Sequence, residues 1–337
     1  MRVRPQDIDP ELRARARFLR FVSAPNRSEA DLRRPQRLRI LTRLMRPPRG
    51  VYADERWVAR PDGSMLRLRV YSPAVPRPEA PGMVWLHGGG YVLGSPEQDG
   101  ASYERIIEAI GAVIVAPDYR LAPVAPYPAA LDDAYLALCW LRDNAAALGV
   151  RDDQLAVAGN SAGGGLAAAL TLLARDRGDV AIAFQMPLYP MLDDRCATES
   201  ACENDAPVWD AVTNRNAWRV YLGELAGTDR VPAFAAPARA VDLRGLPPAF
   251  TYVGGVEPFR DEVVDYVARL RAAGVETAFE VYAGCYHGFD VVAPGAAVSR
   301  RALASQAAWL RMAAERYVAP QPVRYAAPDA TDSLARG

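Results

Sequence analysis

Residues 155–165 read LAVAGNSAGGG, and this stretch decides how the chain folds. Its first four residues are apolar, as expected for a short strand that is buried on both faces. A glycine-rich turn follows at residues 159–163 (GNSAG), and an alanine-rich helix is expected to begin near Gly164. A G-x-S-x-G motif between a strand and a helix is the setting of a nucleophile elbow, which would hold the Ser161 hydroxyl at the apex of a sharp turn.

Strand-like and helix-like runs alternate on both sides of this stretch. Asp62 and Gly63 separate two strand-like runs and predict a hairpin. The alternation that follows predicts a mostly parallel sheet of about eight strands, opened by an antiparallel hairpin and covered by helices on both faces. Strands are expected at 56–60, 65–71, 83–86, 113–116, 155–158, 182–186, 250–253 and 278–282, and helices near 101–110, 129–147, 164–175, 261–273 and 298–316.

Composition excludes several classes of function. The 337-residue chain has 40 basic and 40 acidic residues, and a formal net charge of zero argues against a nucleic-acid binder. Every basic residue is arginine, so lysine Schiff-base chemistry and a Walker-type phosphate loop are excluded. The four cysteines match neither a disulfide framework nor a zinc site, and we expect Cys196 and Cys202 to be reduced thiols. Because the chain has two histidines, a histidine base must be His87 or His287.

No segment favours a membrane location. The N-terminal residues lack the apolar core of a secretory signal. Residues 155–174 are free of charge, but the glycines in their middle favour a strand, a turn and a helix over a membrane span. The sequence therefore predicts a cytoplasmic protein without stable membrane insertion.

The chain divides into five segments along its length. The alternation of strands and helices defines a main unit, which one insertion interrupts, and the proline-containing C-terminal end shows little periodicity. The segments are residues 1–50 (N-terminal helices), 51–190 (first part of the main unit), 191–225 (insertion), 226–319 (second part of the main unit) and 320–337 (flexible tail).

Two of the three segments outside the main unit are expected to contain helices. The first 50 residues carry fourteen arginines, and apolar residues around 18–22 and 38–45 predict two short amphipathic helices. The insertion at 191–225 includes Trp209 and Trp218. It fits either a lid over a binding site or an ordinary surface helix that packs two tryptophans, and both interpretations stay open.

A second glycine-rich stretch supplies candidate hydrogen-bond donors. His87 is followed by Gly88, Gly89 and Gly90 directly after the predicted strand at 83–86. Backbone N–H groups of glycines are unshielded by side chains, so Gly88 and Gly89, together with Ala162, can donate to a carbonyl oxygen as it becomes negative. We expect these three residues to form an oxyanion hole. His87 precedes the elbow in the chain and is interpreted as structural.

His287 and an acidic residue complete a candidate catalytic triad. His287 lies on a loop after the last predicted strand, and a histidine base can take the proton of a serine hydroxyl. Glu257 lies on the loop that leaves the preceding strand, between serine and histidine in chain order, where the acid belongs. Asp261 is the alternative, although its place at the start of a helix also fits a helix-dipole role. Asp290 fits poorly.

These motifs resemble the bacterial hormone-sensitive-lipase-like esterases, a branch of the α/β-hydrolases. The resemblance implies the α/β-hydrolase fold, with Ser161 as nucleophile, His287 as base, position 257 as acid and Gly88, Gly89 and Ala162 as oxyanion donors. It also implies a helical cap, built from residues 1–50 and 191–225, over an acyl pocket for small or medium esters. The motifs are His87–Gly90 (HGGG), residues 118–123 (DYRLAP), 127–130 (YPAA), 159–164 (GNSAGG), 257–262 (EPFRDE) and 287–289 (HGF).

The chain departs from this family at two positions. The family usually has aspartate before the catalytic serine, where this chain has Asn160. The family acid is also usually aspartate, whereas Glu257 is one methylene longer. Since other α/β-hydrolases use glutamate in this role, the triad is retained if the loop that carries Glu257 lies slightly farther from His287.

The function predicted from the sequence is that of a serine carboxylesterase. It would hydrolyse short- to medium-chain esters of small molecules through an acyl-enzyme, without a metal or an organic cofactor. A lactone, carbamate or aryl-amide hydrolase with the same triad is an alternative. A non-catalytic ligand-binding protein on the same scaffold is disfavoured because Ser161 and His287 are both present. Relatives often pair through the last sheet edge, so a homodimer is a further expectation.

Overall fold

The computed structural model describes residues 2–22, 27–33 and 45–322. The first predicted N-terminal helix is present as α1 (Arg13–Val22). The second, expected around residues 38–45, falls largely outside the described residues. A short helix that the sequence analysis did not predict, α2 (Glu29–Arg33), follows α1.

Eight strands form one sheet, in the order β1-β2-β4-β3-β5-β6-β7-β8. β1 pairs antiparallel with β2, β2 pairs antiparallel with β4, and the other neighbouring strands are parallel. The predicted mostly parallel sheet with an opening hairpin is therefore confirmed. The strands are β1 (Val51–Ala59), β2 (Met65–Pro73), β3 (Ala80–Leu86), β4 (Val113–Pro117), β5 (Val150–Asn160), β6 (Phe184–Leu188), β7 (Ala249–Gly254) and β8 (Thr277–Tyr282).

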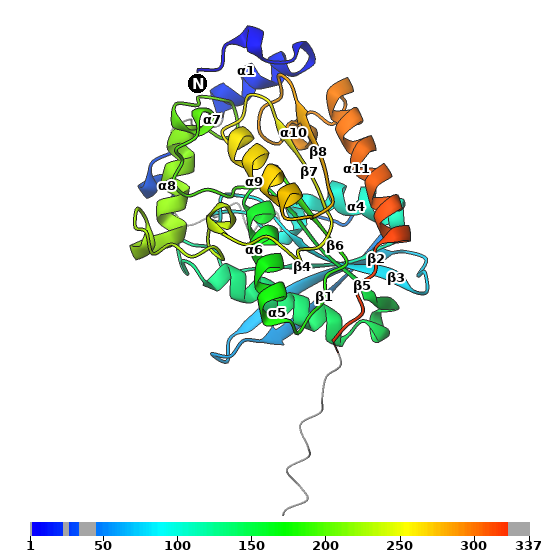
Figure 1. The fold of residues 1–337 in the computed structure, drawn as a ribbon. Coiled ribbons are helices and arrows are strands. Elements are labelled where there is room, and N and C mark those ends of the chain that lie inside the picture. The colour runs from blue at the N-terminus through cyan, green and yellow to red at the C-terminus, as the bar shows by residue number, and fades with distance from the viewer. Residues whose placement is uncertain (1, 23–26, 34–44, 323–337) are drawn as a thin grey trace, which may run out of the picture.

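Helices cover both faces of this sheet. Figure 1 shows α4 and α11 side by side on one face, while α5 and α6 pack together on the other. The remaining α-helices are α4 (Gly100–Ile110), α5 (Ala129–Asp143), α6 (Ala162–Arg177), α7 (Glu199–Cys202), α8 (Ala211–Leu222), α9 (Arg260–Ala272), α10 (Phe289–Val292) and α11 (Ala297–Arg316). Short 3₁₀ turns lie at Pro5–Asp7, Pro10–Leu12, Pro96–Asp99, Ala146–Leu148, Gly223–Leu225 and Pro237–Arg239.

Several elements begin or end a few residues away from their predicted positions. β1 begins at Val51 because the hairpin ladder continues to the pair formed by Val51 and Pro73. The helix predicted over 129–147 ends at Asp143, and a 3₁₀ turn then leads to Gly149 in the left-handed conformation. β6 begins at Phe184, where pairing with β5 begins.

The central strands and α6 form the core that positions the elbow. Every residue of β3 is buried, and so are residues 162–174 of α6. The small residues at the start of α6 allow its backbone to approach the sheet closely. A Cβ added to Gly163 would lie 2.0 Å from the carbonyl oxygen of Leu86, so only glycine fits at that crossing.

The insertion is tied both to the N-terminal segment and to the sheet domain. α2 packs against α8, and Glu29 on α2 lies 3.7 Å from Arg219 on α8. The start of the insertion is held by α9: Glu262 accepts a hydrogen bond from the Leu192 N–H (2.7 Å), and Asp261 accepts one from the Ser200 N–H (2.8 Å). The two acidic residues at the start of α9 therefore fix the insertion in place.

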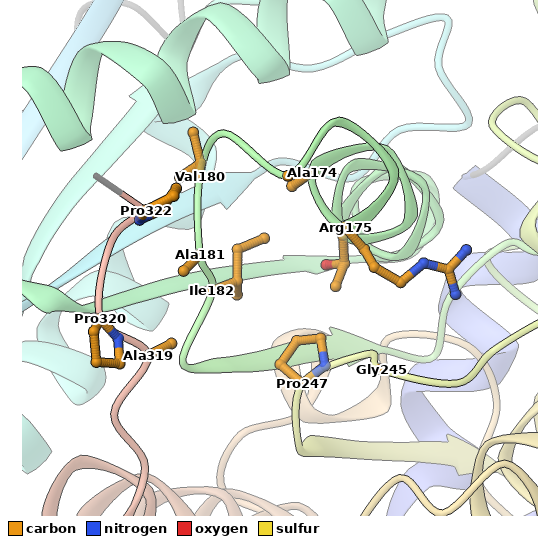
Figure 2. A pocket seen from close by; sticks show the side chains of 12 residues that line it. Ala174, Arg175, Val180, Ala181, Ile182, Gly245, Pro247, Ala319, Pro320 and Pro322 are labelled. Carbon is orange, nitrogen blue, oxygen red and sulfur yellow. The ribbon is translucent and has the colours of Figure 1, made fainter. Parts of the chain in front are cut away.

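The C-terminal segment before residue 323 packs against the sheet domain. The Gln321 side chain donates to the carbonyl oxygens of Asp152 (2.8 Å) and Ala181 (3.0 Å). Residues 320–322, which the sequence analysis assigned to a flexible tail, are thus held, and residues 323–337 lie outside the described part. Figure 2 shows the cavity of about 400 Å³ between this segment and the end of α6. Within the described residues, none of the helices combines the length and the apolar character needed to cross a bilayer.

Candidate active site

Ser161 lies in a strained turn between β5 and α6. Its φ of 58° and ψ of −124° belong to a region that non-glycine residues seldom adopt. The turn is held by its backbone: the Ser161 N–H donates to Leu188 (3.0 Å), and its carbonyl oxygen accepts from Gly165 and Met191 (3.0 Å each). This turn is the geometry expected of a nucleophile elbow, and it directs the side chain away from the strand.

The Ser161 hydroxyl meets an imidazole ring. His287 follows β8, and its Nε2 lies 2.8 Å from the Ser161 Oγ, although 126 positions separate the two residues in the chain. Aromatic rings confine the imidazole, because Tyr189 and Phe259 both pack against it edge-on, with centroid distances of 5.1 and 5.0 Å. The serine and the base are therefore within hydrogen-bond reach, as nucleophilic catalysis requires.

A carboxylate holds the other side of the imidazole. One oxygen of Glu257 is in hydrogen-bond contact with Nδ1 of His287, and the other accepts from the Gly254 N–H at 2.6 Å. The Glu257 side chain is fully buried. Asp261, the alternative acid, instead accepts hydrogen bonds from Ser200 and Arg260. The structure therefore brings Glu257, and not Asp261, to the histidine.

The HGGG stretch lies against the elbow. A Cβ added to Gly88 would be 2.9 Å from the Asn160 Oδ1 and 3.3 Å from the Ser161 Cβ. Within the part of the chain that the structure describes, the N–H groups of Gly88, Gly89 and Ala162 have no protein acceptor. These donors are thus available beside the serine, where an anion is also favoured by the N-terminus of α6.

His87 and Asp290 have other partners. The His87 ring stacks on Tyr119 with a centroid distance of 4.2 Å, and its Nδ1 lies 2.8 Å from the Gly88 carbonyl oxygen. Asp290 accepts a hydrogen bond from the Tyr252 hydroxyl at 2.9 Å. Its burial raises the pKa of its carboxyl above the ordinary value. Both residues support the structure around the site and do not contact Ser161.

A cavity of about 330 Å³ opens onto the serine and the histidine. Trp209, which belongs to the insertion, forms part of the wall of this cavity. Its indole leaves no space for a side chain at Gly90, because a Cβ there would lie 2.3 Å from the ring. The apolar side chains that line the cavity are Leu93, Val208, Trp209, Val291 and Val292. Its polar lining beyond Ser161 and His287 includes Arg27, Gln98, Asp99 and Asn160.

The two charged residues of this lining, Asp99 and Arg27, were not predicted from the sequence. Asp99 is buried and accepts hydrogen bonds from Trp85 (2.8 Å) and Asn160 (3.4 Å). Burial raises the pKa of the Asp99 carboxyl to about 6. Arg27 reaches the cavity from the N-terminal segment. Neither residue belongs to a motif, and fourteen arginines in the first 50 residues gave no reason to single out Arg27.

The cysteines take no part in this arrangement. All four are free thiols, and Cys285, two positions before His287, is fully buried. Cys202 is exposed, and its Sγ lies 3.7 Å from the carbonyl oxygen of the buried Cys196. Cys196 and Cys202 are not joined by a disulfide in the structure, and their reduced state stays a prediction from the sequence.

An α/β-hydrolase is defined by a serine, an acid and a histidine in that chain order. Each of the three lies beyond the carboxyl end of a strand in a mostly parallel sheet. The chain belongs to the α/β-hydrolase fold family, whose model matches residues 83–291, and to its hormone-sensitive-lipase-like branch.

Known relatives agree with this assignment. Carboxylesterase NlhH of Mycobacterium tuberculosis is 38% identical over 250 residues, which cover 72% of this chain and 78% of the relative. An ethyl acetate hydrolase of Pseudomonas putida is 33% identical over 232 residues, or 68% of this chain and 72% of the relative. Among solved structures, a bacterial heroin esterase superposes with a TM-score of 0.83 at 34% identity, covering 91% of this chain and 98% of that one.

Proposed function

We propose that this protein is a serine carboxylesterase that hydrolyses short- to medium-chain carboxylic esters of small molecules. The observation that carries the proposal is the contact of 2.8 Å between the Ser161 Oγ and the His287 Nε2, with Glu257 on the opposite ring nitrogen. Nucleophile, base and orienting acid are thus aligned in the order that acyl transfer requires. Membership in a family that includes carboxylesterases supports the same conclusion.

In the first half of the reaction, Ser161 attacks the ester carbonyl while His287 accepts the hydroxyl proton. Glu257 accepts the Nδ1–H hydrogen bond, which fixes the histidine tautomer and stabilises the imidazolium as it forms. The N–H groups of Gly88, Gly89 and Ala162 donate to the oxyanion of the tetrahedral intermediate. Each such donor typically contributes about 3 kcal/mol to the stabilisation of the transition state.

In the second half, the imidazolium protonates the leaving alcohol and an acyl-enzyme remains on Ser161. The same imidazole then takes a proton from water, and the water oxygen attacks the acyl carbonyl. When the bond to the Ser161 Oγ breaks and the acid is released, the imidazolium returns that proton to Oγ and the free enzyme is restored. The side chains of the triad carry out every proton transfer in this cycle, so the mechanism does not depend on a metal or an organic cofactor.

The walls of the cavity support a preference for modest acyl chains. A volume of about 330 Å³ is at the small end of ligand pockets, and its apolar residues suit short alkyl groups. Trp209 on the insertion and Arg27 on the N-terminal segment both line it. We propose that residues 1–50 and 191–225 together act as the cap. The cytoplasmic location and the homodimer remain predictions from the sequence.

A panel of p-nitrophenyl esters from acetate to laurate, with a lactone, a carbamate and an anilide, tests this function. We expect the highest kcat/KM with short- or medium-chain esters, and no measurable turnover by Ser161→Ala. Faster Ser161-dependent turnover of the lactone, carbamate or anilide would move the assignment to that substrate class. Saturable ligand binding without turnover would indicate a non-catalytic protein.

A further inference from the structure

Arg27 is held in place at the active-site cavity. It lines the same cavity as Ser161 and His287, although it belongs to the N-terminal segment. Two residues of α8 bind its backbone: its N–H donates to the Thr213 hydroxyl (3.2 Å), and its carbonyl oxygen accepts from the Asn216 amide (2.8 Å). These contacts fix the point from which the side chain extends.

The Arg27 guanidinium has no carboxylate partner within the described residues. The acidic residue nearest to it along the described chain, Glu29, pairs with Arg219 (3.7 Å) and Arg33 (4.0 Å). Another arginine of this N-terminal segment, Arg20, does lie near a carboxylate, at 3.8 Å from Asp205. Arg27 is half-buried, lines a concave site with apolar walls and has no counter-ion among the described residues, and a cation in such a setting attracts anionic ligands.

The acidic residue on the wall of the cavity does not cancel this charge. Asp99 is 6% exposed, and its two oxygens accept hydrogen bonds from Trp85 and Asn160. Its carboxylate therefore faces the protein interior. Arg27 is the cationic side chain of the described cavity lining that stays available to a ligand.

We propose that Arg27 is a specificity-determining residue that binds a free carboxylate on the ester substrate. This inference rests on the proposed function and names its substrate class, which is an ester that carries a second, ionised carboxyl group away from the scissile bond. The guanidinium presents two parallel N–H donors, a geometry that matches the two oxygens of a carboxylate. The apolar walls then hold the uncharged part of the substrate.

Two pairs of substrates test the proposal. In each pair, one ester carries a carboxylate and the other carries an isopropyl group of the same shape at that position. For the acyl side, the p-nitrophenyl monoester of succinate is compared with p-nitrophenyl isocaproate. For the alcohol side, para-carboxyphenyl acetate is compared with para-isopropylphenyl acetate.

The variants are Arg27→Gln, which removes the charge, and Arg27→Lys, which keeps it. Arg230→Gln is the control, because Arg230 is exposed, its guanidinium has no partner in the described structure and it does not line the cavity.

We expect Arg27→Gln to lower kcat/KM for the anionic member of at least one pair by about tenfold, the size of one charge-assisted hydrogen bond. The kcat/KM for the neutral member should be unchanged in Arg27→Gln. Arg27→Lys should retain part of the preference for the anionic member, and added salt should weaken that preference. Arg230→Gln should behave as wild type. Equal effects of Arg27→Gln on both members of both pairs would overturn the inference. Failure of the proposed function has a different signature, since neither the anionic nor the neutral esters would then show Ser161-dependent turnover.

Discussion

The side-chain amide of Asn160, the residue before Ser161, donates a hydrogen bond to the carboxylate of Asp99 across 3.4 Å. Position 160 usually carries aspartate in the hormone-sensitive-lipase-like esterases. In this chain an amide stands next to Ser161, and the carboxylate that it contacts lies on the loop after the HGGG stretch. Asp99 also accepts from the Trp85 indole at 2.8 Å, so it joins the end of the 3₁₀ turn at Pro96–Asp99 to the carboxyl ends of β3 and β5.

Replacing Asp99 by asparagine should change the pH dependence of stability. The pKa of Asp99 is raised from an ordinary 3.8 to about 6, mainly by burial, so the carboxyl stabilises the fold below pH 4 and loses this contribution as the pH rises through about 6. This shift in the pKa of Asp99 corresponds to a contribution of about 3 kcal/mol to the free energy of unfolding. The free energy of unfolding of Asp99→Asn, relative to wild type, should therefore rise by about that amount between pH 4 and pH 8. Urea titrations at both pH values measure it, and a difference that is independent of pH would contradict the account.

Asn160→Asp should impair the enzyme even though it introduces the residue that the family usually has. Two carboxylates would then face each other in a buried site, and each would disfavour ionisation of the other. We expect lower stability at pH 8, by about 1–3 kcal/mol, and a lower kcat. The double variant Asp99→Asn/Asn160→Asp exchanges the two groups and should recover most of the loss. If the double variant is no better than Asn160→Asp, repulsion between the two carboxylates is not the cause.

The identity of the triad acid can be tested with two amide substitutions. Glu257→Gln keeps the size of the side chain but removes the charge that orients His287, and we expect kcat to fall by about 10³–10⁴. Asp261→Asn is the matched control, because that carboxylate contacts Ser200 and Arg260 and not the histidine. Its kcat should stay within a few-fold of wild type. Steady-state kinetics with p-nitrophenyl butyrate give the kcat of both variants. A large loss of kcat in Asp261→Asn together with a small loss in Glu257→Gln would exclude Glu257 as the acid.

Close approach of α6 to β3 should make Gly163 intolerant of a side chain. A Cβ there would lie 2.0 Å from the Leu86 carbonyl oxygen, and a backbone atom cannot move aside as a side chain can. We expect Gly163→Ala to destabilise the protein by about 3 kcal/mol or more. Gly295→Ala is the control, since open space surrounds that position, and it should change stability by about 0.5 kcal/mol or less. Thermal unfolding of both variants measures the contrast, and equal melting temperatures would refute the packing argument.

The sheet and the motif-bearing loops could be predicted because local sequence encodes them. Apolar runs such as residues 155–158 mark buried strands, and the glycines around Ser161 mark a turn that few other residues can adopt. Glu257 could be placed next to His287 because parallel strands bring their carboxyl ends to one edge of the sheet. The acidic pair at 261 and 262 was harder to interpret, since their partners belong to the insertion.

Contacts between distant segments could not be predicted in the same way. Nothing in the sequence around Asp99 indicates that it contacts Asn160, because that contact depends on how the 3₁₀ turn at Pro96–Asp99 packs against the end of β5. The approach of Arg27 to the cavity depends on Thr213 and Asn216, nearly two hundred positions away. The paths of the N-terminal segment and the insertion are set by tertiary packing, and the amphipathic pattern of each segment gives no information about its partner.

Covalent labelling of Ser161 tests the central claim most directly. An organophosphate such as diethyl p-nitrophenyl phosphate reacts with a serine only where a base activates it and oxyanion donors stabilise the adduct. Mass spectrometry of the digested protein should find one phosphoryl group per chain, on the peptide that contains Ser161, with loss of esterase activity in parallel. His287→Ala should react far more slowly. Labelling at another residue, or full esterase activity in a protein labelled stoichiometrically at Ser161, would contradict the account.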